Sequence, residues 1–210
     1  MARKSYRKTK FQFTKPLGLL IAFFAVILVV GIITVQPTKK ERLYNAFIDD
    51  SGSNILEVDH NLEEVNVKQL KKQVESAEQG KYIFLLYGSA SSSETVSNLS
   101  AIMQYTEYFE IETLYFLDST NYSASVDDDG NTVTKIEDST VGKLANEINI
   151  KGVTAKAFLQ APGILVFKNN ECVFSFADYY NDEDQLTDGY TVLSLTLQAF
   201  SINIEEKPIV

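Results

Sequence analysis

The pattern of apolar and polar positions changes abruptly at Gly88. An unbroken apolar run from Tyr82 to Tyr87 precedes this glycine, with the length and the aromatic or branched character of a strand that is buried on both faces. A polar loop follows and ends in Ser91-Ser92-Ser93-Glu94, where a serine stands three residues before a glutamate, as in a capping box. The pattern therefore predicts a buried strand, a loop and a helix that begins at this loop.

The same reading predicts the other elements along the chain. Apolar residues at helical spacing indicate helices over Val65 to Gln79, Asp138 to Ile150 and Asp184 to Ile204. Apolar runs indicate a buried strand over Ile111 to Asp118 and short strands over Tyr44 to Ile48 and Ile55 to Val58. The alternation of strands and helices predicts an α/β fold whose first strands are parallel and joined by right-handed crossovers.

The acidic run before Gly130 has two interpretations. A calcium loop with Gly130 at its sixth position would need ligands from Ser125 and Ile136 at its two ends, and isoleucine cannot bind a cation. Asp129-Gly130 is also a favoured dipeptide for a hairpin turn, and Val126 and Val133 flank it. The turn is the interpretation that the ligand pattern favours.

A second informative stretch begins at Ala161-Pro162. The apolar run Gly163 to Phe167 follows the proline directly, then an Asn169-Asn170 turn, and then a second strand beginning at Glu171. This order predicts a β-hairpin whose proline precedes the first strand, where the missing N–H is tolerated.

The strand-loop-helix and proline-hairpin stretches resemble a thioredoxin-like domain over about Val65 to Ile204. They are most similar to the membrane-anchored bacteriocin-transport-accessory or disulfide-isomerase-like proteins of Gram-positive bacteria. The resemblance implies a central mixed sheet flanked by helices and a cis Ala161-Pro162 bond that faces the loop. In that family a Cys-x-x-Cys pair would fall at Ser92 and Thr95, but the chain has no cysteine there. Thiol-disulfide exchange depends on such a thiolate, so redox activity at this loop is not expected.

Hydropathy predicts a single N-terminal transmembrane helix before this domain. The 19 residues from Leu17 to Val35 carry no charge and would form roughly 28 Å of helix, close to the thickness of a bilayer core. Six basic residues and no acidic residue occur up to Val35, which places the N-terminus in the cytoplasm. A cleaved signal peptide is the alternative, but its apolar region is usually only about 7–15 residues long. The predicted organisation is a basic tail (1–16), the transmembrane helix (17–35), a juxtamembrane connector (36–63) and an extracellular domain (64–206).

Charge and composition narrow the possible chemistry. After Val35 the chain carries 13 basic and 28 acidic residues, so nucleic acid is not an expected partner. Cys172 is the single cysteine, which excludes an intramolecular disulfide, and a buried apolar role is favoured over a disulfide to another chain. His60 is the single histidine, so no metal site or cofactor is expected.

The sequence therefore favours a non-catalytic binding or scaffolding module of the bacterial cell envelope. Its expected partners are the lipid bilayer, through the N-terminal helix, and a protein or peptide outside the membrane. The resemblance implies a binding groove lined by Ser91, Ser92, Ser93, Thr95, Ala161 and Pro162. Two alternatives remain. One is an accessory thiol-disulfide protein that acts through Cys172 with a partner oxidoreductase, and the other is a structural subunit of an envelope secretion or bacteriocin-export complex.

Overall fold

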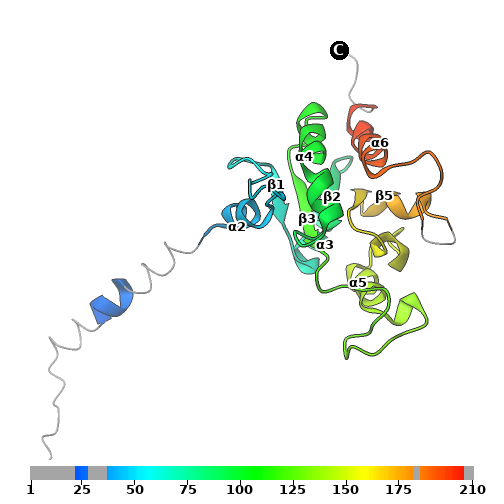
Figure 1. Cartoon of the computed structure of the whole chain (residues 1–210), viewed down its shortest axis with the longest axis horizontal. Coiled ribbons are helices and arrows are strands. Elements are labelled where there is room, and N and C mark those ends of the chain that lie inside the picture. The colour runs from blue at the N-terminus through cyan, green and yellow to red at the C-terminus, as the bar shows by residue number, and fades with distance from the viewer. Residues whose placement is uncertain (1–21, 28–36, 182–184, 206–210) are drawn as a thin grey trace, which may run out of the picture. The chain divides into compact units, whose positions relative to one another are not determined.

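The computed structural model describes residues 22–27, 37–181 and 185–205 (Figure 1). The chain divides into two units, residues 1–38 and 39–210, which are described separately. In the first unit, residues 22–27 are helical, and the rest of the transmembrane helix predicted for Leu17 to Val35 lies outside the described residues, as does the basic tail. Within the described part of the chain, no helix combines the length and apolar character needed to cross a membrane.

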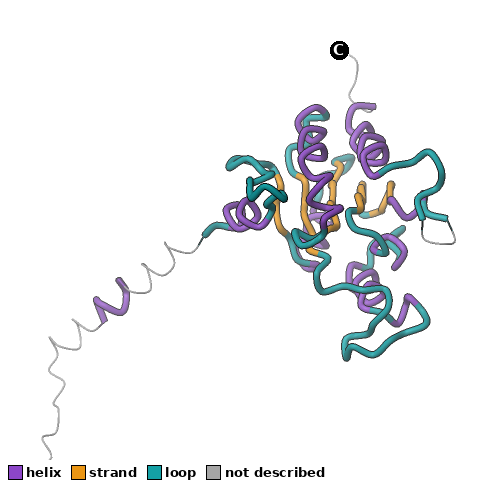
Figure 2. Tube along the Cα trace, in the orientation of Figure 1, coloured by secondary structure: helices purple, strands orange, loops and turns teal. Residues whose placement is uncertain are grey.

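A five-stranded mixed sheet forms the centre of the second unit (Figure 2). Its strands are β1 (Leu62–Glu64), β2 (Tyr82–Gly88), β3 (Leu114–Asp118), β4 (Gly163–Lys168) and β5 (Glu171–Ser175), in the spatial order β1-β3-β2-β4-β5. β1 and β2 run parallel to β3, β4 runs antiparallel to β2, and β5 runs antiparallel to β4. The prediction of a mixed sheet with a parallel part is confirmed.

Helices cover both faces of the sheet. α4 (Ser93–Tyr108) and α6 (Val192–Glu205) lie side by side on one face, and α3 (Val67–Ser76) and α5 (Thr140–Ile148) contact each other on the other face (Figure 1). α2 (Lys39–Ala46) packs Leu43 into the cluster beneath α4 and α6.

β2 is buried on both faces, as its apolar run predicted. Phe84 and Leu86 belong to the core cluster beneath α4 and α6, whereas Ile83, Leu85 and Tyr87 belong to the cluster beneath α3 and α5. Alternate residues of a strand point to opposite faces, so both sets can be apolar only if both faces are covered.

The predicted proline hairpin is confirmed. β4 and β5 are joined at Asn169 and Asn170, which have φ angles of 50° and 61°. Positive φ at both central residues is the geometry of the tight turn that asparagine favours. The Ala161-Pro162 bond is cis, as the resemblance implied. The turn predicted at Asp129-Gly130 is also present, closed by a hydrogen bond from Gly130 N–H to the Asp127 carbonyl.

Two short strands predicted before the domain are wrong. Residues 39–46, which include Tyr44, form α2, because lysine and glutamate in this segment favour a helix. Ile48 makes only an isolated bridge to Asn54. Residues 55–58 form no strand. The segment predicted as a connector, 36–63, contains α2 and most of β1, and both contribute to the core.

Two helix starts also differ from prediction. α6 begins at Val192 rather than Asp184, because Thr191 and Ser194 cap each other: each backbone N–H donates to the other's hydroxyl, at 2.8 and 3.1 Å. α4 begins one residue later than the capping box of Ser91 and Glu94 requires, and Ser92 is its N-cap.

Candidate functional site

The serine loop, residues 89–93, lies at the edge of the sheet where β2 and β3 end and β4 begins. Tyr87 of β2 pairs with Gly163 of β4, which places Pro162 beside the end of β2. Ser119 N–H, just after β3, donates to the Gly88 carbonyl at 2.7 Å. The topology therefore brings the serine loop, the Ala161-Pro162 bond and the residues after β3 to one edge.

A chain of hydroxyl groups connects the serine loop to β3. Ser89 Oγ lies 2.8 Å from both Ser91 Oγ and Thr120 Oγ1, and Thr120 Oγ1 donates to Asp118 Oδ1 at 2.6 Å. Each hydroxyl has one proton to donate. Since the Thr120 proton goes to the carboxylate, Ser89 donates to Thr120 and Ser91 donates to Ser89. The four side chains form one directed chain that ends at a charged acceptor.

Thr95 holds the start of α4 against the end of β2. Its side chain is fully buried, its Oγ1 accepts from Ser89 N–H at 3.4 Å, and its own N–H donates to Ser92 Oγ at 3.3 Å. Gly88 leaves the room that this contact needs, because a Cβ there would lie 2.8 Å from Thr95 Cγ2. Thr95 therefore positions the loop from beneath.

The six residues predicted for the groove differ in exposure. Ser91 and Ser93 are exposed, Ser92 and Ala161 are half-buried, and Thr95 and Pro162 are buried. The surface that a ligand can reach at this edge is therefore made by the two outer serines together with the partly exposed Ala161 and the cap residue Ser92.

Tyr180, which the sequence analysis did not assign to this site, lies close enough to the first turn of α4 for the charge of Glu94 to affect it. Burial, and then the negative charge of Glu94 in the first turn of α4, raises the pKa of Tyr180 to about 12. Tyr87 lies beneath the same edge, where burial is the main cause of a raised pKa and the charge of Asp118 adds to it. The edge therefore combines hydroxyl groups, two carboxylates and aromatic rings.

Cys172 lies far from the serine loop. It pairs with Phe167 of β4, which in turn pairs with Ile83 of β2, five residues before Gly88. At about 3.3 Å per residue this separation is roughly 16 Å along the sheet. The thiol is half-buried and donates to the Phe174 carbonyl at 3.2 Å, and burial raises its pKa to about 11.

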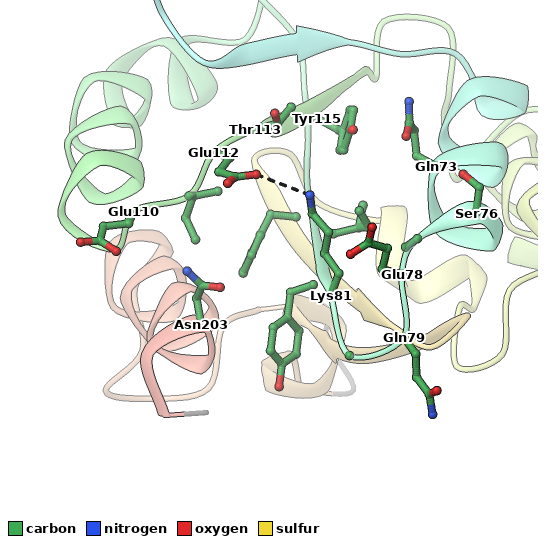
Figure 3. A pocket seen from close by; sticks show the side chains of 16 residues that line it. Gln73, Ser76, Glu78, Gln79, Lys81, Glu110, Glu112, Thr113, Tyr115 and Asn203 are labelled. Atoms are coloured by element: carbon green, nitrogen blue, oxygen red, sulfur yellow. Dashed lines mark hydrogen bonds and ion pairs between the residues drawn. The ribbon is translucent and has the colours of Figure 1, made fainter. Parts of the chain in front are cut away.

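A hollow of about 820 Å³ lies at the opposite end of β2 and β3 (Figure 3). Lys81 and Glu112 form an ion pair across it at 3.4 Å, and Gln73, Glu78 and Asn203 are on its walls (Figure 3). Both partners of this ion pair are exposed, and such pairs contribute little in water.

No protein-family model matches the sequence, and no curated protein matches it. Within residues 37–181 and 185–205 no group of three histidine, cysteine or carboxylate side chains is placed to hold a metal ion. At the serine loop the exposed hydroxyl groups of Ser91 and Ser93 can donate and accept hydrogen bonds.

Proposed function

We propose that this protein is a membrane-anchored, extracellular thioredoxin-like module of the bacterial cell envelope that binds a polypeptide and carries out no thiol chemistry. Support for the family comes from the order of elements that carried the resemblance: a β-α-β-α-β unit followed, after a further helix, by the proline hairpin. Support for the anchor comes from the 19 uncharged residues from Leu17 to Val35 and the basic residues before them.

The observation that carries the proposal is the position of the serine loop. It follows the central strand, begins a helix and lies beside Pro162, and its side chains are hydroxyls where the family would have thiols. At the start of α4 the Thr95 N–H donates to the cap residue Ser92, whereas the N–H groups of Ser93 and Glu94 have no partner within the helix and can donate to a ligand carbonyl. Together with the exposed hydroxyls of Ser91 and Ser93, they suit the alternating donors and acceptors of an extended chain.

The alternative that acts through Cys172 has less support. Burial raises the pKa of the Cys172 thiol to about 11, so the thiol is almost entirely protonated at neutral pH, whereas the thiolate is the reactive form. The thiol is also about 16 Å along the sheet from the loop. A redox partner that bound at the serine loop would not reach it.

Site-specific photocrosslinking in cells tests the proposal. A photoreactive residue at Ser93, which is exposed at the start of α4, is compared with one at Lys72, which is exposed on α3. We expect a discrete protein adduct from position 93 only, and mass spectrometry of that adduct identifies the partner. Equal adducts from both positions, or none from a correctly anchored protein, would contradict a binding role for the loop.

A further inference from the structure

Basic side chains gather on α2 and α3 in a domain that is otherwise acidic. After Val35 the chain has 13 basic and 28 acidic residues, and six of the basic ones lie on these two helices. Lys71 is half-buried and pairs with Glu75 at 4.0 Å, whereas the other five are exposed. We call these five the α2–α3 basic patch: Lys39, Lys40 and Arg42 of α2, and Lys68 and Lys72 of α3.

Side-chain contacts join the two halves of the patch. Lys39 Nζ donates to the Glu64 carbonyl at the end of β1, at 3.3 Å, and to Gln69 Oε1 on α3, at 3.5 Å. Gln69 follows Lys68 directly and stands three residues before Lys72, and residues three apart are neighbours on a helix surface. The basic groups of α2 and α3 therefore belong to one continuous surface.

Carboxylates neutralise only part of this charge. Arg42 forms an ion pair with Glu64 at 3.6 Å, but none of the four lysines of the patch forms an ion pair with a described residue. Both α2 and α3 begin at the patch, so the positive ends of their dipoles add to its field. The patch therefore attracts an anionic partner, which the acidic remainder of the domain would repel.

The place of the patch in the chain indicates which anion it meets. Only three residues, Gln36 to Thr38, separate Lys39 from Val35, where the predicted transmembrane helix ends. Four steps between consecutive Cα atoms span at most about 14 Å, so α2 cannot lie farther than this from a membrane that the helix spans. The headgroup layer of a bilayer is itself about 5–7 Å deep on each side. The patch is therefore within reach of lipid headgroups.

We propose that the α2–α3 basic patch docks the domain against the phosphate groups of anionic lipids at the outer surface of the membrane. This inference rests on the membrane anchor of the proposed function, and it concerns a surface other than the serine loop. Leu43 of α2 and Leu70 and Val74 of α3 are buried in the core, so both helices are fixed to the sheet. Docking of the patch therefore orients the whole domain.

The docked orientation has a consequence for the serine loop. Glu64, at the end of β1, pairs with Phe116 of β3, which pairs with Leu86 near the end of β2. The three strands are parallel, so the start of α3 lies at the same edge of the sheet as the serine loop. The patch would hold that loop, and a polypeptide bound to it, close to the membrane surface.

Acetylation of lysine side chains tests the docking. Full-length protein is reconstituted in nanodiscs of phosphatidylcholine alone or of an equal mixture with phosphatidylglycerol, and mass spectrometry follows the acetylation rate at each lysine. We expect the lysines of the patch to react at least about fivefold more slowly in the anionic nanodiscs. This factor corresponds to about 1 kcal/mol, the attraction of one basic side chain to an anionic surface. Lys135 and Lys156, which are also exposed, should react at the same rate in both.

A matched pair of variants and two solution conditions identify the cause of the protection. Lys72→Gln should reduce the protection of Lys40 and Lys68, whereas Lys156→Gln should leave it unchanged. Protection should disappear in about 1 M salt, where the Debye length is only about 3 Å. Equal protection in neutral nanodiscs by about 10 mM inorganic phosphate would assign the patch to a soluble anion and overturn the membrane proposal.

Failure of the docking is distinguishable from failure of the anchor. Unchanged rates at the patch in protein that stays in the nanodiscs, or equal slowing at Lys135 and Lys156, would overturn the docking and leave the anchor intact. Loss of the protein from nanodiscs of phosphatidylcholine alone would refute the anchor and the docking together.

Discussion

Replacing Gly88 by alanine tests whether close contact holds α4 against the end of β2. The new Cβ would lie 2.8 Å from Thr95 Cγ2 and 3.1 Å from Thr95 Oγ1, inside normal contact distance. Thr95 is fully buried and hydrogen-bonded through both its N–H and its hydroxyl, so it has little freedom to move away. Overpacking of this kind costs about 1–3 kcal/mol, and we expect Gly88→Ala to lower the free energy of unfolding by about 2 kcal/mol.

A second substitution identifies the contact responsible. Thr95→Ser removes Cγ2 and keeps the hydroxyl that accepts from Ser89 N–H. Alone it costs about 1 kcal/mol, because one buried methyl group is lost. Combined with Gly88→Ala it also removes the closest clash, so the double variant should be more stable than the sum of the single effects by at least about 1 kcal/mol.

Urea unfolding of the full-length protein in detergent, followed by far-ultraviolet circular dichroism, measures these free energies, since the chain has no tryptophan to report by fluorescence. Thr106→Ser is the matched control, because Thr106 is also a fully buried threonine of α4 but lies three turns away. The effects of Thr106→Ser and Gly88→Ala on the free energy of unfolding should add when the two substitutions are combined. Additivity within about 0.5 kcal/mol for the Thr95 pair as well would refute the proposed contact.

Two further predictions concern the hydroxyl chain and the buried acids. Ser89→Ala removes the hydroxyl that accepts from the Ser91 N–H. We expect this change to lower the free energy of unfolding by about 1–3 kcal/mol and to speed hydrogen exchange of the amide at position 91. Ser93→Ala, at an exposed position, is the control, and equal effects of the two substitutions would contradict the prediction. Burial raises the folded-state pKa of Cys172 from 9.0 to about 11 and that of Tyr180 from 10.0 to about 12. The folded protein therefore resists ionisation of these two groups more than the unfolded chain does. Their contribution to the free energy of unfolding is complete below about pH 9 and is lost as the pH rises to 12. Urea midpoints between pH 8 and 12 should fall accordingly, and a flat profile would contradict the burial of these groups.

Some elements could be predicted from a few consecutive residues of the sequence. The apolar run of β2 and the Asn169-Asn170 turn each contain their own structural signal, because burial on both faces and positive φ are properties of a few consecutive residues. β1 was missed because it has three residues and only Leu62 is fully buried, so no alternation was available to read. The start of α6 was misplaced because the predicted helix was extended back to Asp184, whereas the mutual cap of Thr191 and Ser194 starts it at Val192.

The site was less predictable than the fold. Ser89 and Thr120 are 31 positions apart, and only the parallel pairing of β2 with β3 brings their hydroxyls together. The burial of Thr95 likewise depends on the glycine that it packs against.

The burial of β2 on both faces affects how the register between β2 and β4 is determined during folding. A slip of one residue would exchange the two faces of the strand, and since both are apolar, the hydrophobic pattern alone opposes such a slip only weakly. The ends of the strand provide the discrimination: Gly80 N–H binds Asn169 Oδ1 at 2.9 Å before it, and Gly88 meets Thr95 after it. Substitutions at these ends should therefore broaden the set of strand alignments that the folding chain samples, whereas substitutions within the strand should change mainly how firmly one alignment is held.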